Sequence, residues 1–196
     1  AGHTVTDCMP SLVPLTVSED YIGEMAGLSL RNVELTIRNG KKILYQDFGE
    51  MMFTHKGITG PLVLSASSAI GKQLKKQGTL EGYIDLKPAL SSEQLDERIL
   101  REFENAKNKQ FKNVIGVLFP SSLTPVIIRL GGIPEDKVIH EISREERLNF
   151  VSIIKAFPFT IDGLGGYSEA VITKGGISVK EINPGTMESK KIPQLY

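Results

Sequence analysis

The sequence has one cysteine, no tryptophan and three histidines among its 196 residues. The single cysteine, Cys8, excludes an internal disulfide and a cysteine-based zinc cluster, and we interpret it as a buried structural thiol. The histidines His3, His55 and His140 lie too far apart in sequence for a metal-ligand spacing. We therefore expect no metal site, and the scarcity of cysteine fits a cytoplasmic location.

An excess of charge of either sign is also lacking, since 23 basic residues are balanced by 23 acidic ones. This balance gives no electrostatic support for binding nucleic acid, and no apolar run approaches the roughly 18 residues that span a bilayer. We expect neither a nucleic-acid nor a membrane partner. The glycines from Gly163 to Gly166 do not complete a dinucleotide fingerprint, because Ser168 replaces the third small residue and a strand pattern follows. We interpret them as a β-turn.

The first half of the chain has mostly strand patterns. Apolar and polar residues alternate over 33–38, and Asn39-Gly40 predicts a type I′ hairpin turn with positive φ at both residues. The pattern after Pro61 favours a helix. The predicted elements are strands at Leu12–Val17, Lys42–Phe48, Met51–Thr54 and Leu80–Leu86, and a helix at Leu62–Lys76.

From Ser91 the pattern becomes helical. Ser91 with Gln94 and Ser143 with Glu146 each form a capping-box sequence. Thr124-Pro125 predicts a cap and first-turn proline for a short helix between them, which Gly131-Gly132 ends. The helix after Ser143 is expected to run through Phe157, where Pro158 stops it.

Strand patterns return after Pro158, at 159–161, 170–173 and 177–182. The order β, α, β predicts an α+β fold in which a β-barrel-like domain is interrupted by a small helical subdomain. We assign residues 1–90 and 158–196 to the discontinuous barrel-like domain and residues 91–157 to the helical subdomain.

The segment Gly49–Pro61, GEMMFTHKGITGP, contains the best candidate for a site. A strand that ends in Thr54 and His55 before a glycine- and proline-rich loop places a hydroxyl and an imidazole at the rim of a sheet. From the residues alone, the favoured alternative is a partly buried histidine that is satisfied by a backbone carbonyl.

A second candidate is Thr173-Lys174-Gly175-Gly176-Ile177, where adjacent glycines allow a flat ligand to approach the backbone closely. The favoured alternative here is an ordinary hairpin. No serine lies in a nucleophile elbow. The lysines Lys72, Lys75 and Lys76 are interpreted as a solvated helix face.

Four ordered segments resemble the BaiN/YhiN-like NAD(P)/FAD-dependent oxidoreductases, the aminoacetone-oxidase-like flavoproteins. Gly49–Pro61 resembles their GE-x-LFTH-x-G-x-SGP stretch, with Thr59 in place of serine and Met52 in place of leucine. The other three segments cover the two ends of the chain: His3 with 10–15, residues 170–177 with Ile177 in place of valine, and 186–189 followed by Pro193 and Leu195-Tyr196.

In that family a Rossmann-like FAD domain is interrupted by a barrel-like domain and a helical one, and this chain resembles the interruption alone. The resemblance implies that Thr173, Lys174, Gly175, Gly176 and Ile177 lie near the flavin, and that Thr54 and His55 line or brace the substrate side. The implied partners are the FAD-binding domain of the same longer chain and a small-molecule substrate, with NAD(P)H as a candidate co-substrate.

Two hypotheses follow. In the first, the chain is the substrate-side insert of a FAD-dependent NAD(P)-linked oxidoreductase or oxidase, inactive and without bound flavin when isolated. In the second, it is a free-standing β-barrel binding or interaction module without catalytic activity. Whether the chain counts as an enzyme is left open by the residues themselves.

Overall fold

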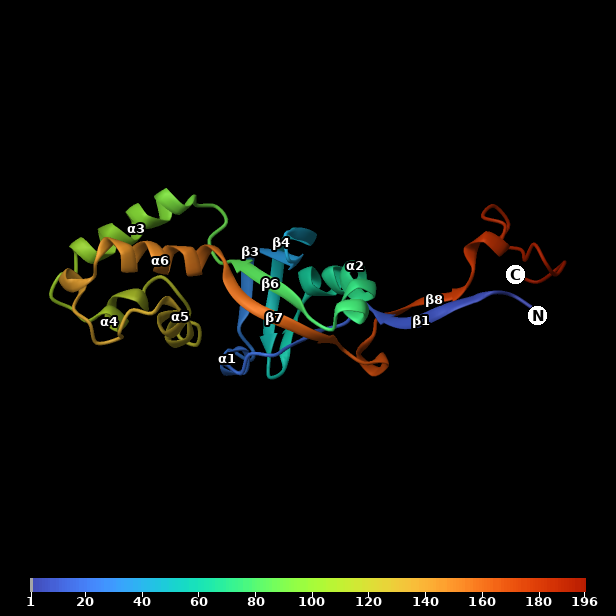
Figure 1. Ribbon diagram of the computed structural model, residues 1–196, viewed down its shortest axis with the longest axis horizontal. Helices are drawn as coiled ribbons and strands as arrows, with labels where there is room; N and C mark the ends of the chain where they lie inside the picture. Colours follow the sequence, from blue (N-terminus) through green and yellow to red (C-terminus); the bar gives the residue numbers. More distant parts are fainter. Residues whose placement is uncertain (1) are drawn as a thin grey trace.

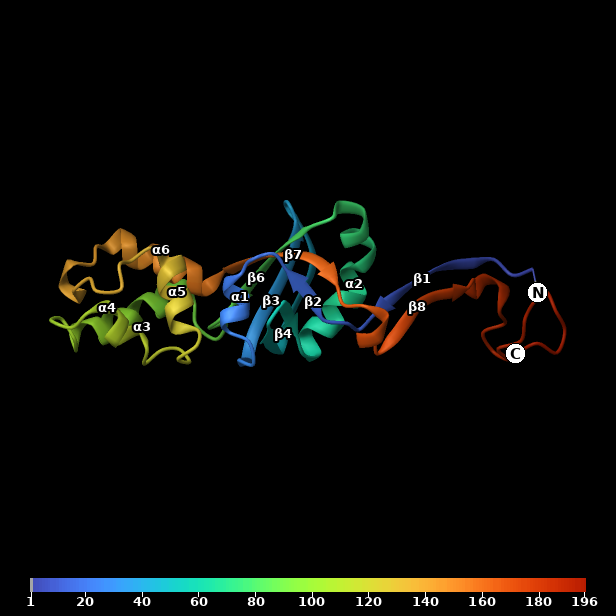
Figure 2. The same ribbon diagram turned by 90° about the horizontal axis from the view of Figure 1, so that it is seen from below.

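The computed structural model describes residues 2–196. A helical unit, a β-barrel and a two-stranded ribbon follow one another along the longest axis of the molecule (Figure 1). The same elongated order is seen after a quarter turn, with both chain ends beyond the ribbon (Figure 2). The barrel thus lies between the helical unit and the ribbon that leads to the termini.

Six antiparallel strands form a closed barrel in the order β2-β5-β4-β3-β6-β7. Their bounds are Leu15–Val17 (β2), Ser29–Asn39 (β3), Lys42–Thr54 (β4), Gly57–Thr59 (β5), Leu80–Asp85 (β6) and Phe157–Leu164 (β7). Closure removes the exposed edges of the sheet. The predicted α+β fold with a barrel is confirmed.

The β3–β4 hairpin differs in detail from its prediction. Asn39 remains extended and pairs with Lys42, so the two-residue loop is Gly40-Lys41, in which only Gly40 has a positive φ, of 57°. The expected turn with two positive φ angles is therefore wrong. The strands predicted at Lys42–Phe48 and Met51–Thr54 are one continuous strand, β4.

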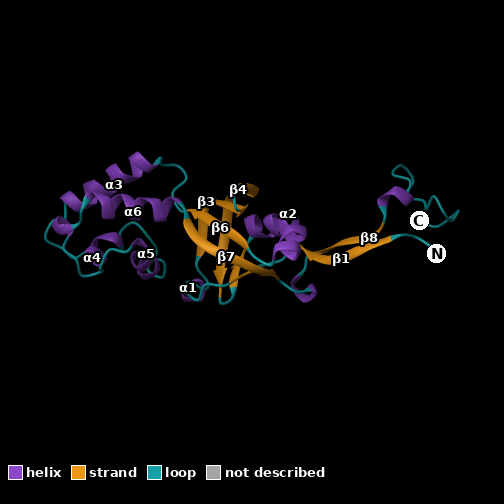
Figure 3. Cartoon of the chain, in the orientation of Figure 1, coloured by secondary structure: helices purple, strands orange, loops and turns teal. Residues whose placement is uncertain are grey.

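The ribbon was not predicted. It consists of β1 (Val5–Ser11) paired antiparallel with β8 (Ile172–Ile177), outside the barrel (Figure 3). The strand predicted from Leu12 starts only at Leu15, because Leu12 has a φ of 53° and the chain turns there. The separate strands predicted at 170–173 and 177–182 are replaced by β8 and by a 3₁₀ helix, Val179–Glu181.

Helix α2, Pro61–Gln77, lies between the barrel and the ribbon (Figure 1). Its buried residues follow the i, i+4 spacing of one helix face, and they include Leu62, Ala66, Ile70 and Leu74. The helix therefore buries one face against the barrel and leaves its lysines on the opposite, exposed side.

The helical unit is inserted between β6 and β7. It contains α3 (Ser92–Glu104), α4 (Phe111–Ile115), α5 (Thr124–Gly131) and α6 (Arg144–Lys155). Both predicted capping boxes are present. The Ser91 and Ser143 hydroxyls accept hydrogen bonds from the backbone amides of Gln94 and Glu146, and the side chains of Gln94 and Glu146 accept from the backbone amides of Ser91 and Ser143.

Two helix ends were predicted wrongly. Thr124 does not cap α5, because its hydroxyl donates to the carbonyl of Pro120 at 3.0 Å. Helix α6 ends at Lys155, and both Phe157 and Pro158 belong to β7, where Phe157 is fully buried. The helical spacing of apolar residues continues to Phe157, but burial of its ring in the barrel favours the strand conformation there.

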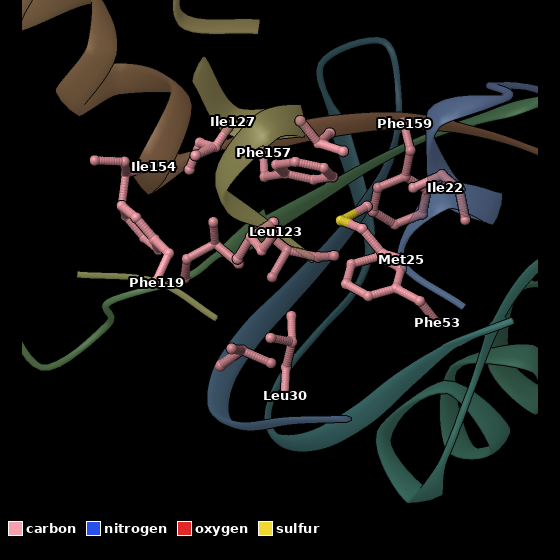
Figure 4. Close-up of a cluster of buried hydrophobic side chains, with 14 of the residues drawn as sticks. Ile22, Met25, Leu30, Phe53, Phe119, Leu123, Ile127, Ile154, Phe157 and Phe159 are labelled. Atoms are coloured by element: carbon pink, nitrogen blue, oxygen red, sulfur yellow. The ribbon is translucent and has the colours of Figure 1, made fainter. Parts of the chain in front are cut away.

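One hydrophobic core continues from the helical unit into the barrel (Figure 4). Phe157 is central: its ring meets Tyr21 of helix α1 (Tyr21–Glu24) edge-on at 5.9 Å and Phe53 of β4 at 6.3 Å. Residues of the helical unit such as Leu123 and Ile154 face the same cluster. Each fully buried side chain of this size contributes about 1.5–3 kcal/mol, so the helical unit is joined to the barrel by its core.

Polar contacts fix the same junction. The Lys155 ammonium lies 2.5 Å from Asp85 and donates to the Leu90 carbonyl at 2.6 Å. Arg129 of α5 bonds Glu24 of α1 at 2.8 Å. No helix within residues 2–196 has the length and apolar character needed to cross a bilayer.

Candidate functional site

Thr54 and His55 lie at the β4–β5 turn. Thr54 ends β4, and His55 with Lys56 makes the two-residue connection to β5. The His55 side chain is exposed and has no hydrogen-bond partner within residues 2–196, so the alternative of a partly buried, carbonyl-bonded histidine is wrong. Its backbone carbonyl lies beside Gly23 of α1.

The second candidate segment, Thr173–Ile177, lies inside β8. The ordinary hairpin considered for it is not present, because Lys174 pairs with Met9 and Gly176 pairs with Thr6 of β1. Gly175 and Gly176 have φ angles of +111° and +99°. The register of β1 shifts between Thr6 and Met9, and such bulges often adjoin functional sites.

The two glycines have different surroundings. A Cβ at Gly175 would lie 2.3 Å from the Asp7 carbonyl oxygen, whereas nothing lies within 4 Å of a Cβ built at Gly176. Glycine is therefore required at position 175, because the backbone of β1 passes too close for a side chain. The bare backbone at Gly176 therefore has open space beside it.

A groove runs between α2 and the ribbon. A cavity of about 770 Å³ is lined by Lys72 and Lys75 of α2, by Lys174 and Gly175 of β8, and by Asp7 and Met9 of β1. Its volume is within the range of small-molecule sites. The Lys174 ammonium crosses to α2 and donates to the Ser68 carbonyl at 3.0 Å.

A second cavity, of about 430 Å³, opens on the other side of Met9 and Lys75. It is mostly apolar, with Leu74 and Leu164 in its lining. Cys8 also lines this cavity, and its side chain is exposed, so the prediction of a buried thiol is wrong. Because Met9 and Lys75 line both cavities, the two form neighbouring compartments of one groove along α2.

The structure does not bring the two predicted sets of site residues together. Lys174 and Gly175 line the groove on the ribbon side, whereas Thr54 and His55 line neither of its cavities. The turn that carries His55 instead lies beside Gly23 of α1.

Sequence reasoning missed a network that joins the two ends of the chain. The ring nitrogens of His3 bond Glu181 at 2.7 Å and Ser189 at 2.9 Å. The order serine, histidine, carboxylate resembles a hydrolase triad, but the Ser189 oxygen also accepts the amides of Lys191 and Ile192. The hydrogen-bonding capacity of that oxygen is thus filled, so the network has a structural role. We call this network of His3, Glu181 and Ser189 the terminal pin, because it joins the two ends of the chain. His3 and Glu181 are 178 residues apart, so no local pattern could reveal it.

Glu181 is the anionic centre of this pin. Hydrogen bonds from Lys191, then from Thr4 and His3, lower the pKa of Glu181 from 4.5 to about 2. The carboxylate is therefore ionised at neutral pH and holds the N-terminal and C-terminal segments together. Within residues 2–196 no group of three or more histidine, cysteine or acidic residues could hold a metal ion.

The arrangement of a barrel with an inserted helical unit has a counterpart among known families. A family model described as "HI0933-like protein barrel and H2TH domain" matches residues 9–172. The chain belongs to this family. This match confirms the family resemblance that the four sequence motifs indicated.

Members of the HI0933-like family with curated names match the chain along its whole length. Two ribosomal RNA dihydrouridine synthases, from Haemophilus influenzae and Escherichia coli, are 34% and 30% identical to it. A 3-dehydro-bile acid delta(4,6)-reductase from Clostridium scindens is 25% identical. The chain covers 45%, 46% and 47% of these three proteins, respectively, and so spans about half the length of the relatives it matches.

Proposed function

We propose that this chain is the substrate-side region of a larger flavin-dependent reductase, in which it covers the flavin and shapes the substrate pocket. The observation that carries the proposal is the glycine pair of β8 with positive φ angles, whose open backbone at Gly176 fits a flat ring beside the groove. The family match and the reductase named among the relatives support it.

FAD, when bound in the full-length protein, would supply hydride transfer. The residues of this chain that would adjoin it are Thr173–Ile177, the segment expected near the flavin from the motif resemblance. Their part is to present backbone to the ring and to exclude water from one side. The FAD-binding domain of the same longer chain is the proposed partner, and NAD(P)H is the proposed source of reducing equivalents.

Thr54 and His55 stay candidates for the substrate side. The exposed His55 imidazole has no partner within residues 2–196, so it is free to contact a substrate or a neighbouring part of the longer chain. We also propose residues 91–157 as the helical subdomain, whose last residue, Phe157, is at the same time the first residue of β7. We further propose a cytoplasmic location for the whole protein.

Flavin binding tests this function. We expect the full-length protein to be purified with FAD and to oxidise NAD(P)H, whereas the 196-residue chain alone is colourless and inactive. The measurement is visible absorbance after denaturation, followed by NAD(P)H consumption. A full-length protein without flavin would instead support the β-barrel binding module.

A further inference from the structure

We propose that a pocket at the start of the helical unit binds a small aromatic carboxylate, with its ring among apolar side chains and its carboxylate at Lys87 and Arg98. The pocket lies between the connection from β6 to α3, helix α3 itself and residues 117–119. No residue of the ribbon lines it. The inference therefore goes beyond the proposed function and does not depend on the flavin.

The apolar part of the pocket is built on the core. Its walls include Leu95 and Phe119, which are both buried, and Phe119 belongs to the hydrophobic cluster of Figure 4. Val117 lines the same pocket but is 73% exposed, so an apolar ligand would remove it from water. The volume is about 150 Å³, and an engineered cavity of about this volume holds benzene. The pocket thus has room for one ring but not for a fused ring system.

Two cations from different elements line this pocket. Lys87 comes from the connection after β6, and Arg98 comes from α3. Burial, and then the positive charge of Arg98, lower the pKa of Lys87 below its ordinary value. Both effects disfavour the charged ammonium group, and an anion that contacts both cations would offset the second effect.

The protein supplies too little negative charge for these two cations. No carboxylate within residues 2–196 forms an ion pair with Lys87. Arg98 pairs with Glu102 at 3.4 Å, but the Arg98 side chain is half exposed and the pair is weak. One carboxylate against two cations leaves a shortfall of about one negative charge, which a monoanion would supply. The guanidinium group can bind both oxygens of a carboxylate at once.

A cation–π contact gives a simpler explanation for the position of Lys87. Its Nζ lies 5.5 Å from the centroid of the Phe119 ring, which is within the range of that interaction. The contact does not account for Arg98, whose charge at the same pocket opposes that of Lys87. A carboxylate that accepts from both cations explains the two together and leaves the ring contact in place.

The test is a titration of the full-length protein with sodium benzoate, followed by the methyl NMR signals of leucine and valine. Leu90, Leu95 and Val117 line the pocket and act as local probes. We expect their signals to shift with a dissociation constant on the order of 1 mM, as for other ligands of this size. Benzyl alcohol keeps the ring but has no charge, so it should bind about tenfold more weakly. Acetate has the carboxylate without the ring and should not shift these signals at the same concentrations.

Lys87→Met tests the contribution of the charge. The backbone amide of Lys87 donates to Asp85 and its carbonyl accepts from Lys155, so these main-chain bonds do not depend on the side chain that is replaced. We expect the affinity for benzoate to fall about tenfold, whereas the affinity for benzyl alcohol changes little. The matched control is Lys109→Met, at an exposed position of the helical unit outside the pocket, which should bind benzoate like the unsubstituted protein.

Thermal unfolding identifies a variant that fails to fold, and Arg98→Gln, at a half-exposed position, then replaces Lys87→Met with the same expected loss. Benzoate shifts that are absent, or confined to methyl groups elsewhere in the protein, would overturn the site. Equal affinity for benzoate and benzyl alcohol would also overturn it, as would an equal loss in Lys87→Met and Lys109→Met. Flavin content does not enter these measurements, so the pocket and the proposed function can each fail without the other.

Discussion

Glu181 shows how one carboxylate joins segments from the two ends of the chain. Lys191 lies 2.8 Å from one of its oxygens, His3 lies 2.7 Å from the other, and Thr4 donates to both. These bonds favour the ionised form, which is why the pKa is lowered to about 2. A lowered pKa means that the folded state binds protons less readily than the unfolded state.

The pin is therefore expected to open in acid. Its contribution is complete above the ordinary pKa of 4.5 and is lost as the pH falls through the folded-state value of about 2. Amide NMR signals of Ser189, Lys191 and Ile192 should shift between pH 4.5 and 2, and Glu181→Gln should place them in the opened positions already at pH 7. Glu104→Gln, at an exposed helix position, is the control. Unchanged signals at pH 2 would show that the carboxylate does not hold the pin.

The glycine pair of β8 is the element on which the proposed flavin contact depends. Gly175→Ala would add a Cβ 2.3 Å from the Asp7 carbonyl oxygen and strain a φ of +111°, whereas Gly176→Ala would strain a φ of +99° without a collision. We expect Gly175→Ala to disrupt the pairing of β1 with β8 and to remove most of the flavin from the full-length protein.

Gly176→Ala is the matched control for the pairing of β1 with β8. It is not a control for flavin binding, because its Cβ would enter the open space proposed for the ring. It should cost about 1–3 kcal/mol of local strain but keep the strands paired. The measurements are hydrogen exchange of the ribbon amides and flavin absorbance per mole of protein. An equal loss of ribbon protection in both variants would mean that the close approach of β1 is unimportant.

Elements whose signals are local were predictable from the sequence. The capping boxes at Ser91 and Ser143 need only contacts three residues apart, and the β3–β4 hairpin needs only alternation and a glycine. The ribbon was missed because Val5 pairs with Ile177 across nearly the whole chain. Likewise, the segment Thr173–Ile177 could be chosen as a candidate from its glycines, but its groove could not, since that requires the placement of α2.

The whole molecule combines a well-packed part with an exposed one. The core runs without interruption through the barrel and the helical unit, but the ribbon beyond it is exposed along most of both strands. Apolar side chains remain uncovered there: Val5 is 65% exposed, Ile177 is 48% exposed, and Val179, just after β8, is 84% exposed. A two-stranded ribbon is only marginally stable by itself. We infer that the remainder of the longer protein covers this surface.

Hydrogen exchange measured on two forms of the protein tests that inference. In the 196-residue chain, the amides of β1 and β8 should exchange at least a hundredfold faster than those of β3 and β6, because little buried area opposes their opening. In the full-length protein the ribbon amides should slow by a similar factor, while the amides of β3 and β6, already buried in the barrel, change little. Ribbon amides that exchange equally fast in both forms would show that the apolar surface stays uncovered, and the proposed contact between the ribbon and a flavin-bearing domain would then fail.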